Sequence, residues 1–183
     1  MRSKRYKIAA ALIAVLMCPD IAAATEFACD APSDKSNSVS LAISGETRIA
    51  GAIRKMELRD GRFMPLAGAR LVGTDGIVNL GFELAAPSPD ATEFEVVVNS
   101  NRGDGHRSEI IGRISTGETI PFSIILHENG DASVEIRDYK YAAKFVPLTE
   151  GKGVFFCSTG QFQFSDLTAS TNIQKPSAPS SPH

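Results

Sequence analysis

The stretch TIPFSIILHENGDASVEIR, residues 119–137, carries the clearest structural signal in this chain of 183 residues. Every second residue from Ile120 to Leu126 is apolar, and Val134 and Ile136 alternate with polar residues after Asn129-Gly130. Asn and Gly tolerate the positive φ angles that a tight reversal requires. Because side chains alternate between the two faces of a strand, each arm has one apolar face and one wetter face. The stretch therefore predicts an antiparallel β-hairpin.

The same pattern of short apolar runs between Gly, Pro, Asn and Asp continues on both sides of this hairpin. The one candidate helix, at 84–91, is interrupted by Pro87 and Pro89. Many short strands without helices favour two packed antiparallel sheets, so the predicted fold is an all-β, two-sheet antiparallel jelly-roll sandwich. Strands are expected at residues 39–44, 48–58, 69–73, 77–84, 94–99, 109–114, 119–126, 133–137, 142–147, 153–157 and 161–167.

The two ends of the chain differ in composition from its middle. Basic residues open the first 24, an apolar run follows, and Ala22-Ala23-Ala24 has the small side chains that a signal peptidase accepts. We therefore expect a signal peptide at 1–24 and a protein that is secreted or periplasmic. A polar lead-in is expected at 25–37 and the sandwich domain at 38–169. The Pro- and Ser-rich segment 170–183 is expected to be a disordered tail.

Two cysteines, Cys29 and Cys157, remain after the predicted signal peptide, because Cys18 falls within it. In an oxidising compartment an isolated pair most simply forms a disulfide, and here it would join the start of the domain to one of its last strands. A lipid anchor on Cys18 is the alternative, but Leu16 and Met17 are bulky where that cleavage prefers small residues.

The charge balance narrows the choice of partners. The whole chain has a net charge of −2, and the first 24 residues hold four of the 19 basic residues but one of the 21 acidic residues. The remainder therefore carries about −5 (15 against 20), which argues against nucleic acid or an anionic membrane as partner. After residue 24, no apolar stretch is long enough to span a membrane as a helix.

Residues 93–167 resemble the second half of a concanavalin A-like jelly roll of the galectin and laminin-G-like type. The resemblance rests on the strand ending Val98-Asn99-Ser100, the Gly-rich segment after it, the Asn-Gly hairpin and the closing run from Gly160 to Phe164. It implies a sandwich fold and a glycan ligand. The alternating His, Asn and Arg of the galectin strand are missing before Val96, and the chain has no Trp to serve as a sugar platform.

The densest polar cluster is the segment 99–109, in which Gly103 and Gly105 allow sharp turns. We expect a loop at the rim of the sandwich, either a ligand-binding loop or a solvated connection. Asp104 with Asn99 or Asn101 could hold Ca²⁺, although no cofactor is required. The candidate ligand-binding residues are Asn99, Asn101, Arg102, Asp104, His106, Arg107 and Glu109.

Catalytic signatures are incomplete. Arg107-Ser108-Glu109-Ile110 resembles the Arg-Ser-Glu-Leu strand of jelly-roll alginate lyases, but the Gln-x-His strand that accompanies it there is absent. Glu93 and Glu95 share a strand face, yet no third acid extends them into a glucanase motif. The sequence favours an exported, non-catalytic binding module for a cell-envelope or extracellular glycan. A periplasmic protein-interaction module, with an envelope protein as partner, and a small glycan-cleaving enzyme remain the alternatives.

Overall fold

The structure, a computed structural model, describes residues 25–171, which form ten strands and no helix. The predicted signal peptide and residues 172–183 lie outside the described part of the chain. The strands are β1 (Thr25–Ser44), β2 (Thr47–Leu58), β3 (Leu66–Gly73), β4 (Asn79–Ala85), β5 (Glu93–Asn101), β6 (His106–Ser115), β7 (Thr119–Leu126), β8 (Asp131–Ile136), β9 (Tyr139–Lys144) and β10 (Glu150–Thr171). Within 25–171 there is no helix that is long and apolar enough to cross a membrane.

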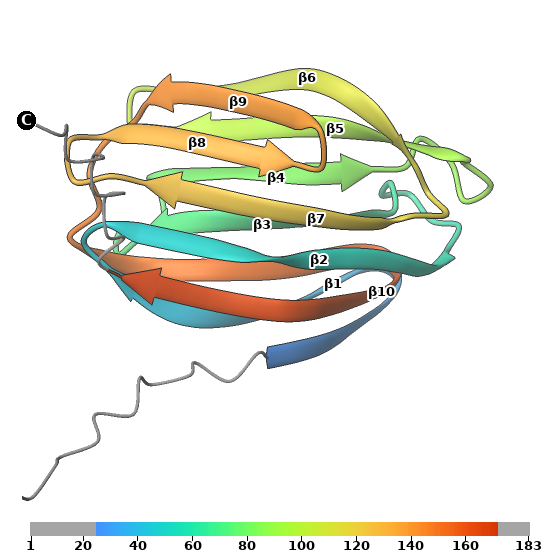
Figure 1. Ribbon diagram of the computed structural model, residues 1–183. Coiled ribbons are helices and arrows are strands. Elements are labelled where there is room, and N and C mark those ends of the chain that lie inside the picture. The colour runs from blue at the N-terminus through green and yellow to red at the C-terminus, as the bar shows by residue number, and fades with distance from the viewer. Residues whose placement is uncertain (1–24, 172–183) are drawn as a thin grey trace, which may run out of the picture.

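All pairings are antiparallel, and the strands form two layers that lie face to face (Figure 1). The first, here called the β3–β6 sheet, contains β6, β5, β4 and β3, followed by residues 150–158 of β10 and 36–44 of β1. The second, the β7–β9 sheet, contains β9, β8, β7 and β2, followed by residues 160–171 of β10 and 25–31 of β1. The predicted two-sheet antiparallel sandwich is thereby confirmed.

Strand β10 belongs to both sheets. Ser158 is the last residue to pair with β3, and Gly160 is the first to pair with β2. Between them Thr159 has a φ of 50°, and this local reversal lets the strand leave one layer and enter the other. The sequence had predicted two separate strands here, because Thr159-Gly160 looks like an interruption. It is instead a bend within one strand of 22 residues.

Strand β1 bends at the same level, since its register against β10 shifts between Ala31 and Ser36. Residues 25–37, expected as a polar lead-in, are part of β1, and most of them pair with β10. No strand was predicted before residue 39, because most of these residues are polar. Their pairing depends on backbone hydrogen bonds to β10 and on two buried apolar side chains, Cys29 and Ala31.

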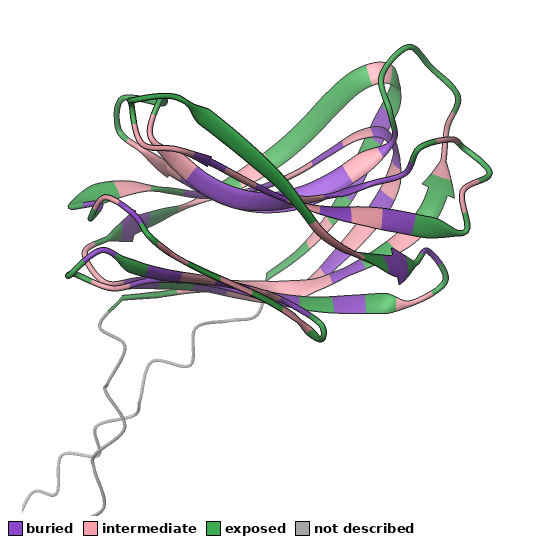
Figure 2. Cartoon of the chain, turned by 90° about the horizontal axis from the view of Figure 1, so that it is seen from above, coloured by how far each residue is buried: buried purple, intermediate pink, exposed green. Residues whose placement is uncertain are grey.

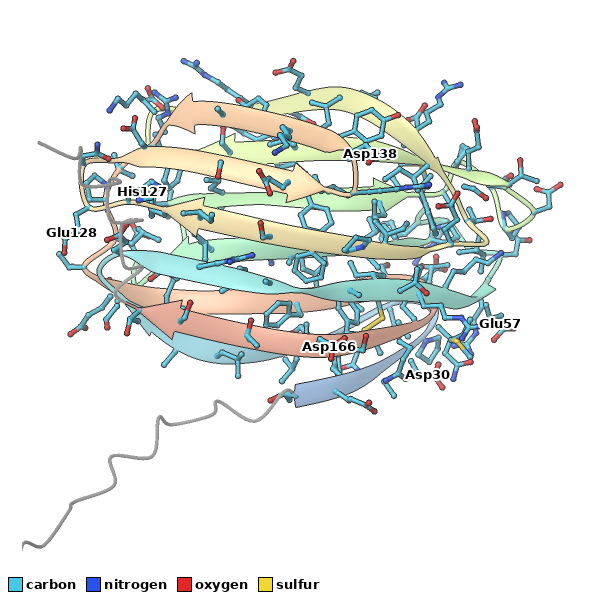
Figure 3. All side chains as sticks on the ribbon, viewed as in Figure 1. Asp30, Glu57, His127, Glu128, Asp138 and Asp166 are labelled. Carbon is cyan, nitrogen blue, oxygen red and sulfur yellow. A yellow bond between two sulfur atoms is a disulfide. The ribbon has the colours of Figure 1, made fainter. Side chains whose placement is uncertain are left out.

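The core lies between the layers and is rich in phenylalanine. Phe82, Phe122 and Phe155 are in successive ring contact, with centroids 5.2 and 6.1 Å apart, and Phe155 also contacts Phe164. Such tilted and edge-on contacts are the favourable geometries for aromatic pairs. Figure 2 shows buried residues alternating with less buried ones along the strands, as expected when one face of each strand meets the core.

The hairpin predicted at Asn129-Gly130 joins β7 to β8. The N–H of His127 donates to the carbonyl oxygen of Asp131 at 2.8 Å, and Gly130 has a φ of 81°, which a side chain would make unfavourable. The Asn129 side-chain oxygen accepts a hydrogen bond from the Asp131 N–H at 2.9 Å. The turn is therefore closed by the residue types on which the prediction depended.

The disulfide between Cys29 and Cys157 is also confirmed, with Cα atoms 6.1 Å apart and both cysteines fully buried. Cys29 lies in the half of β1 that belongs to the β7–β9 sheet, whereas Cys157 lies in the half of β10 that belongs to the β3–β6 sheet. The bond therefore connects the two layers at the level where both strands bend.

Candidate functional site: a pocket on the outer face of the β3–β6 sheet

Side chains that are paired across neighbouring strands point to the same face of a sheet. On the outer face of the β3–β6 sheet, one row of paired residues contains Arg70 on β3, Gly81 on β4 and Asn99 on β5. The adjacent row contains Phe156 on β10, Gly68 on β3 and Glu83 on β4. The two rows bring an aromatic ring, a guanidinium, a carboxylate and an amide together around two glycines.

These residues surround a shallow depression, which we call the face pocket. Its volume is about 160 Å³, and it is lined by Arg70, Asn79, Gly81, Phe82, Glu83, Asn99, His106 and Phe156. Phe82 itself points into the core and is 1% exposed, so it presents its backbone to the pocket. Five strands contribute side chains, which places the site on the rigid part of the fold.

Gly68 and Gly81 keep the floor of the face pocket free of side chains. A Cβ on Gly68 would overlap the carbonyl oxygen of Phe82 and press against the ring of Phe156. A Cβ on Gly81 would overlap the carbonyl oxygen of Ala69 and the side chain of Arg70. Only glycine fits at either position without moving the neighbouring strand, so the depression is built into the sheet.

The polar groups of the face pocket are available to a ligand. The Arg70 guanidinium lies over the ring of Phe156, 4.9 Å from its centroid, a geometry that both holds and orients the cation. Within residues 25–171, the side chains of Arg70, Glu83 and Asn99 form no hydrogen bond or ion pair with other described residues. Arg70 is exposed, and Glu83 and Asn99 are half-buried.

The polar segment 99–109 is a β-hairpin rather than a loop. Strand β5 extends to Asn101 and β6 begins at His106, which leaves four residues in the turn. Asn99 and His106 line the face pocket. Asn101 lies in the next row of the same face, paired with His106, and its side-chain oxygen accepts a hydrogen bond from the Gly103 N–H at 2.9 Å.

The other four predicted residues lie outside the face pocket. Arg102 lines a separate hollow of about 270 Å³ beside the β3–β4 turn, and Asp104 is at the exposed tip of the hairpin. Arg107 and Glu109 pair with Ser100 and Val98, so they belong to the opposite face of β6. They are exposed there because β6 is an edge strand.

The described residues contain no cluster of His, Cys, Asp and Glu side chains that would bind a metal ion. Across residues 25–171, no group of three or more His, Cys, Asp or Glu side chains is placed to bind one ion. The side-chain oxygen of Asn101, which was expected among the groups that could hold Ca²⁺, accepts the Gly103 N–H at 2.9 Å.

Arg70, Glu83 and Phe156 were missed by the sequence analysis. The signal for Phe156 is the pair Phe155-Phe156 on one strand, because adjacent residues point to opposite faces and one ring must face outwards. The signal for Arg70 is a single charge in the otherwise small and apolar run Leu66–Gly73. The glycines of that run would have indicated a close approach between neighbouring strands.

No protein-family model and no curated protein sequence matches the chain. Solved structures do match. They include the polysaccharide lyase family 18 structure aly-SJ02 r-CATD (TM-score 0.56, 10% identity, covering 80% of this chain and 88% of that chain). They also include a β-glucanase of Bacillus licheniformis (TM-score 0.52, 11% identity, covering 81% and 78%).

A third similar structure is the CBM2 module of the evolved Dit protein of Lactobacillus casei BL23 phage J-1 (TM-score 0.53, 9% identity, covering 81% of this chain and 77% of that chain). One polysaccharide lyase, one β-glucanase and one CBM2 module share the architecture. Identities this low carry fold and not function. The chain accordingly has the concanavalin A-like jelly-roll fold that the sequence resemblance implied.

Proposed function

We propose that this chain is an exported, non-catalytic carbohydrate-binding module that holds a neutral glycan in the face pocket. The observation that carries the proposal is the convergence of Arg70, Glu83, Asn99 and Phe156 around a floor of glycines. Glycan-related proteins among the similar structures support the same ligand class, because both binding modules and glycan-acting enzymes share this fold.

The chemistry of the pocket suits sugar hydroxyls. A guanidinium donates several hydrogen bonds in a fixed plane, a carboxylate only accepts, and an amide does both. Neighbouring hydroxyls on a sugar ring can therefore be matched by Arg70, Glu83 and Asn99 together. The ring of Phe156 offers an apolar surface for the C–H face of the sugar, and the stacked Arg70 keeps that ring in place.

The charges in the pocket favour a neutral sugar. Arg70 contributes one positive charge and Glu83 one negative charge, so an acidic sugar would meet the Glu83 carboxylate as well as the guanidinium. Like charges placed close together are unfavourable, particularly where solvent is partly excluded. We therefore expect uncharged polysaccharides to bind better than polyuronates.

The number of carboxylates in the face pocket favours binding over hydrolysis. Of the described residues that line the face pocket, Glu83 is the one carboxylate. Glycoside hydrolysis by the common mechanisms needs two carboxyl groups, about 5 to 9.5 Å apart, across the scissile bond. The buried disulfide between Cys29 and Cys157 supports export, because such bonds persist in oxidising compartments.

The test is a glycan array probed with residues 25–183, followed by calorimetry on the glycans that bind. Arg70→Ala and Asn99→Ala should each weaken binding about tenfold or more, since each removes hydrogen bonds worth about 1.5 kcal/mol. Arg48→Ala, which removes an exposed arginine from β2 in the other sheet, is the matched control and should bind as the unmodified chain does.

Three outcomes would contradict the proposal. The absence of binding to any glycan on the array would exclude a lectin-like role. Retention of full affinity by both pocket variants would place the site elsewhere. Release of shorter sugars or unsaturated ends during incubation would show catalysis. Repeating the array in EDTA tests Ca²⁺ separately, because a loss of signal would show that a cation takes part.

A protein-interaction role has one supporting observation of its own. Met56, Phe63 and Met64, at the end of β2 and in the connection to β3, are each 55–56% exposed. Exposed apolar groups that lie close in the chain can mark an interface. Cross-linking of the protein in intact cells, with Phe63→Ser/Met64→Ser as the comparison, tests this second candidate. Identical cross-linked products from both forms would exclude it.

A further inference from the structure

We propose that the glycan site does not end at the face pocket but continues along β5, so that its ligand is a linear oligosaccharide of several units. This inference rests on the proposed function. It is drawn from a second depression on the same sheet face, which we call the distal hollow. That hollow has a volume of about 350 Å³ and is lined by Pro87, Ser88, Ala91, Thr92, Glu93, Glu95 and Arg113.

The two depressions lie on one face and on one strand. Along β5 the buried side chains are Phe94, Val96, Val98 and Ser100, so the residues between them point outwards. Glu95 therefore faces the same side as Asn99. They are four positions apart along the extended strand, a distance of about 13 Å at 3.3 Å per residue. That separation exceeds a single sugar ring, and only a chain of linked sugars would contact both.

The surface between the depressions is apolar. Val97 on β5 is paired with Ile110 on β6, and both belong to the outward row. Ile110 is 59% exposed, although isoleucine is among the residues most often buried. A lone exposed isoleucine would need no explanation. This one lies between two polar depressions, where it offers a surface for the C–H face of the sugar that bridges them.

The distal hollow repeats the chemistry of the face pocket. The Arg113 guanidinium donates to a carboxylate oxygen of Glu95 at 3.2 Å, and both groups remain partly exposed, at 65% and 34% of their side-chain surface. Each depression thus combines one arginine with at least one carboxylate, an arrangement that matches hydroxyl pairs, and Glu93 adds a second carboxylate to the distal hollow. A neutral polysaccharide lying along β5 would meet the same kind of contact at both ends.

The experiment measures affinity against chain length. Linear β-1,4-glucan, β-1,3-glucan and β-1,4-mannan oligosaccharides, from one sugar unit to six, are titrated by calorimetry into the unmodified chain. Within the series that binds, the longest oligosaccharides should bind about tenfold or more tighter than the shortest. Ile110→Ala and Glu95→Gln should each weaken binding of the hexasaccharide about three- to tenfold and leave the shortest bound sugar unaffected.

Met56→Ala is the matched control, because Met56 is 55% exposed on β2 and lies in the other sheet. It should bind every length as the unmodified chain does. Equal affinity for short and long sugars, with no effect of Ile110→Ala or Glu95→Gln, would overturn the extended site while leaving the face pocket intact. No binding in any series, together with a silent array, would overturn the proposed function itself.

Discussion

The hydroxyl of Tyr139 is bonded to both backbone groups of Arg113. It donates to the carbonyl oxygen at 2.9 Å and accepts from the N–H at 3.3 Å. Tyr139 lies on β9 and Arg113 on β6, so one phenol connects the two sheets at the edge opposite the disulfide. The ring also occupies the space above Gly112, where a Cβ would overlap it.

Tyr139→Phe should lower the free energy of unfolding by about 1 to 2 kcal/mol, because two hydrogen bonds to β6 are lost while the ring stays in place. Urea titration followed by far-ultraviolet circular dichroism measures the change. Tyr141→Phe is the matched control, since the Tyr141 hydroxyl has no hydrogen-bond partner in the described part of the chain. Equal stabilities of the two variants would contradict the assigned role of the Tyr139 hydroxyl.

Removal of the disulfide should destabilise the fold strongly. The bond closes a loop of 128 residues, for which the chain-entropy model gives about 4 to 5 kcal/mol. Cys29→Ala/Cys157→Ala should therefore unfold at a much lower urea concentration than the oxidised parent. The reduced parent should behave like the double variant, and a difference below 1 kcal/mol between oxidised and reduced forms would contradict the prediction.

Acid should weaken the attachment of the β2–β3 connection. The Asp34 carboxylate accepts the N–H groups of Arg62 and Phe63, at 2.6 and 3.2 Å, and its other oxygen accepts from the Arg62 side chain at 3.3 Å. Partial burial alone would raise the pKa of Asp34, but the bonds from Phe63 and Arg62 outweigh it and hold the pKa below the ordinary value of 3.8.

A carboxylate whose pKa is depressed on folding stabilises the protein above its unfolded pKa, and that contribution is lost as pH falls through the lower, folded pKa. The parent should therefore lose stability below about pH 4 more steeply than Asp34→Asn does. Thermal melts from pH 7 to pH 2 measure both. Asp104→Asn is the control, because Asp104 is an acid at the exposed tip of the β5–β6 hairpin. The stability of this variant should change with pH as that of the parent does. Parallel curves for parent and Asp34→Asn would refute this.

Substitutions in the face pocket and at the tip of the β5–β6 hairpin should affect glycan binding differently. Asn99→Ala should weaken glycan binding about tenfold, whereas Asp104→Ala should change it less than twofold, because Asp104 lies outside the pocket. The reverse order would restore the tip as the binding element. Both residues are exposed or half-buried, so neither change is expected to alter folding.

Phe156→Leu tests whether glycan binding needs the aromatic ring of Phe156 or only an apolar side chain at this position. Leucine keeps the outer face of β10 apolar but cannot hold the Arg70 guanidinium by a cation–π contact, worth about 0.5 to 1 kcal/mol at an exposed site. We expect glycan affinity to fall about three- to tenfold with little change in unfolding free energy. Unchanged affinity would show that the ring is not a sugar platform.

Alternation was sufficient to predict the strands with one clear apolar face. The run 119–126 was predicted with the bounds of β7, and the hairpin at Asn129-Gly130 followed from its turn residues. The alternation of apolar and polar residues did not predict strands whose pairing depends on tertiary context. The polar residues 25–37 are held in β1 by β10, and Thr159-Gly160 is a bend and not a boundary, because distant strands continue the hydrogen bonding on both sides of it.

Only part of the candidate site could be predicted from the sequence. Asn99 and His106 were found because polar residues gather in that segment, but the same reasoning included Arg107 and Glu109, which alternate onto the other face. Arg70 and Glu83 come from the consecutive strands β3 and β4, whereas Phe156 comes from β10, far along the chain. Their meeting depends on the register of the sheet, and local composition does not specify register.

Strand β10, shared by the two sheets, has a consequence for biosynthesis. It is the final strand of the domain to be made, yet β1, β2 and β3 all find their hydrogen-bonding partner in it. Neither layer can therefore be completed until β10 has been made, and such non-local pairing is slow to form. Until then the polypeptide exposes unsatisfied strand edges, which make it vulnerable to aggregation.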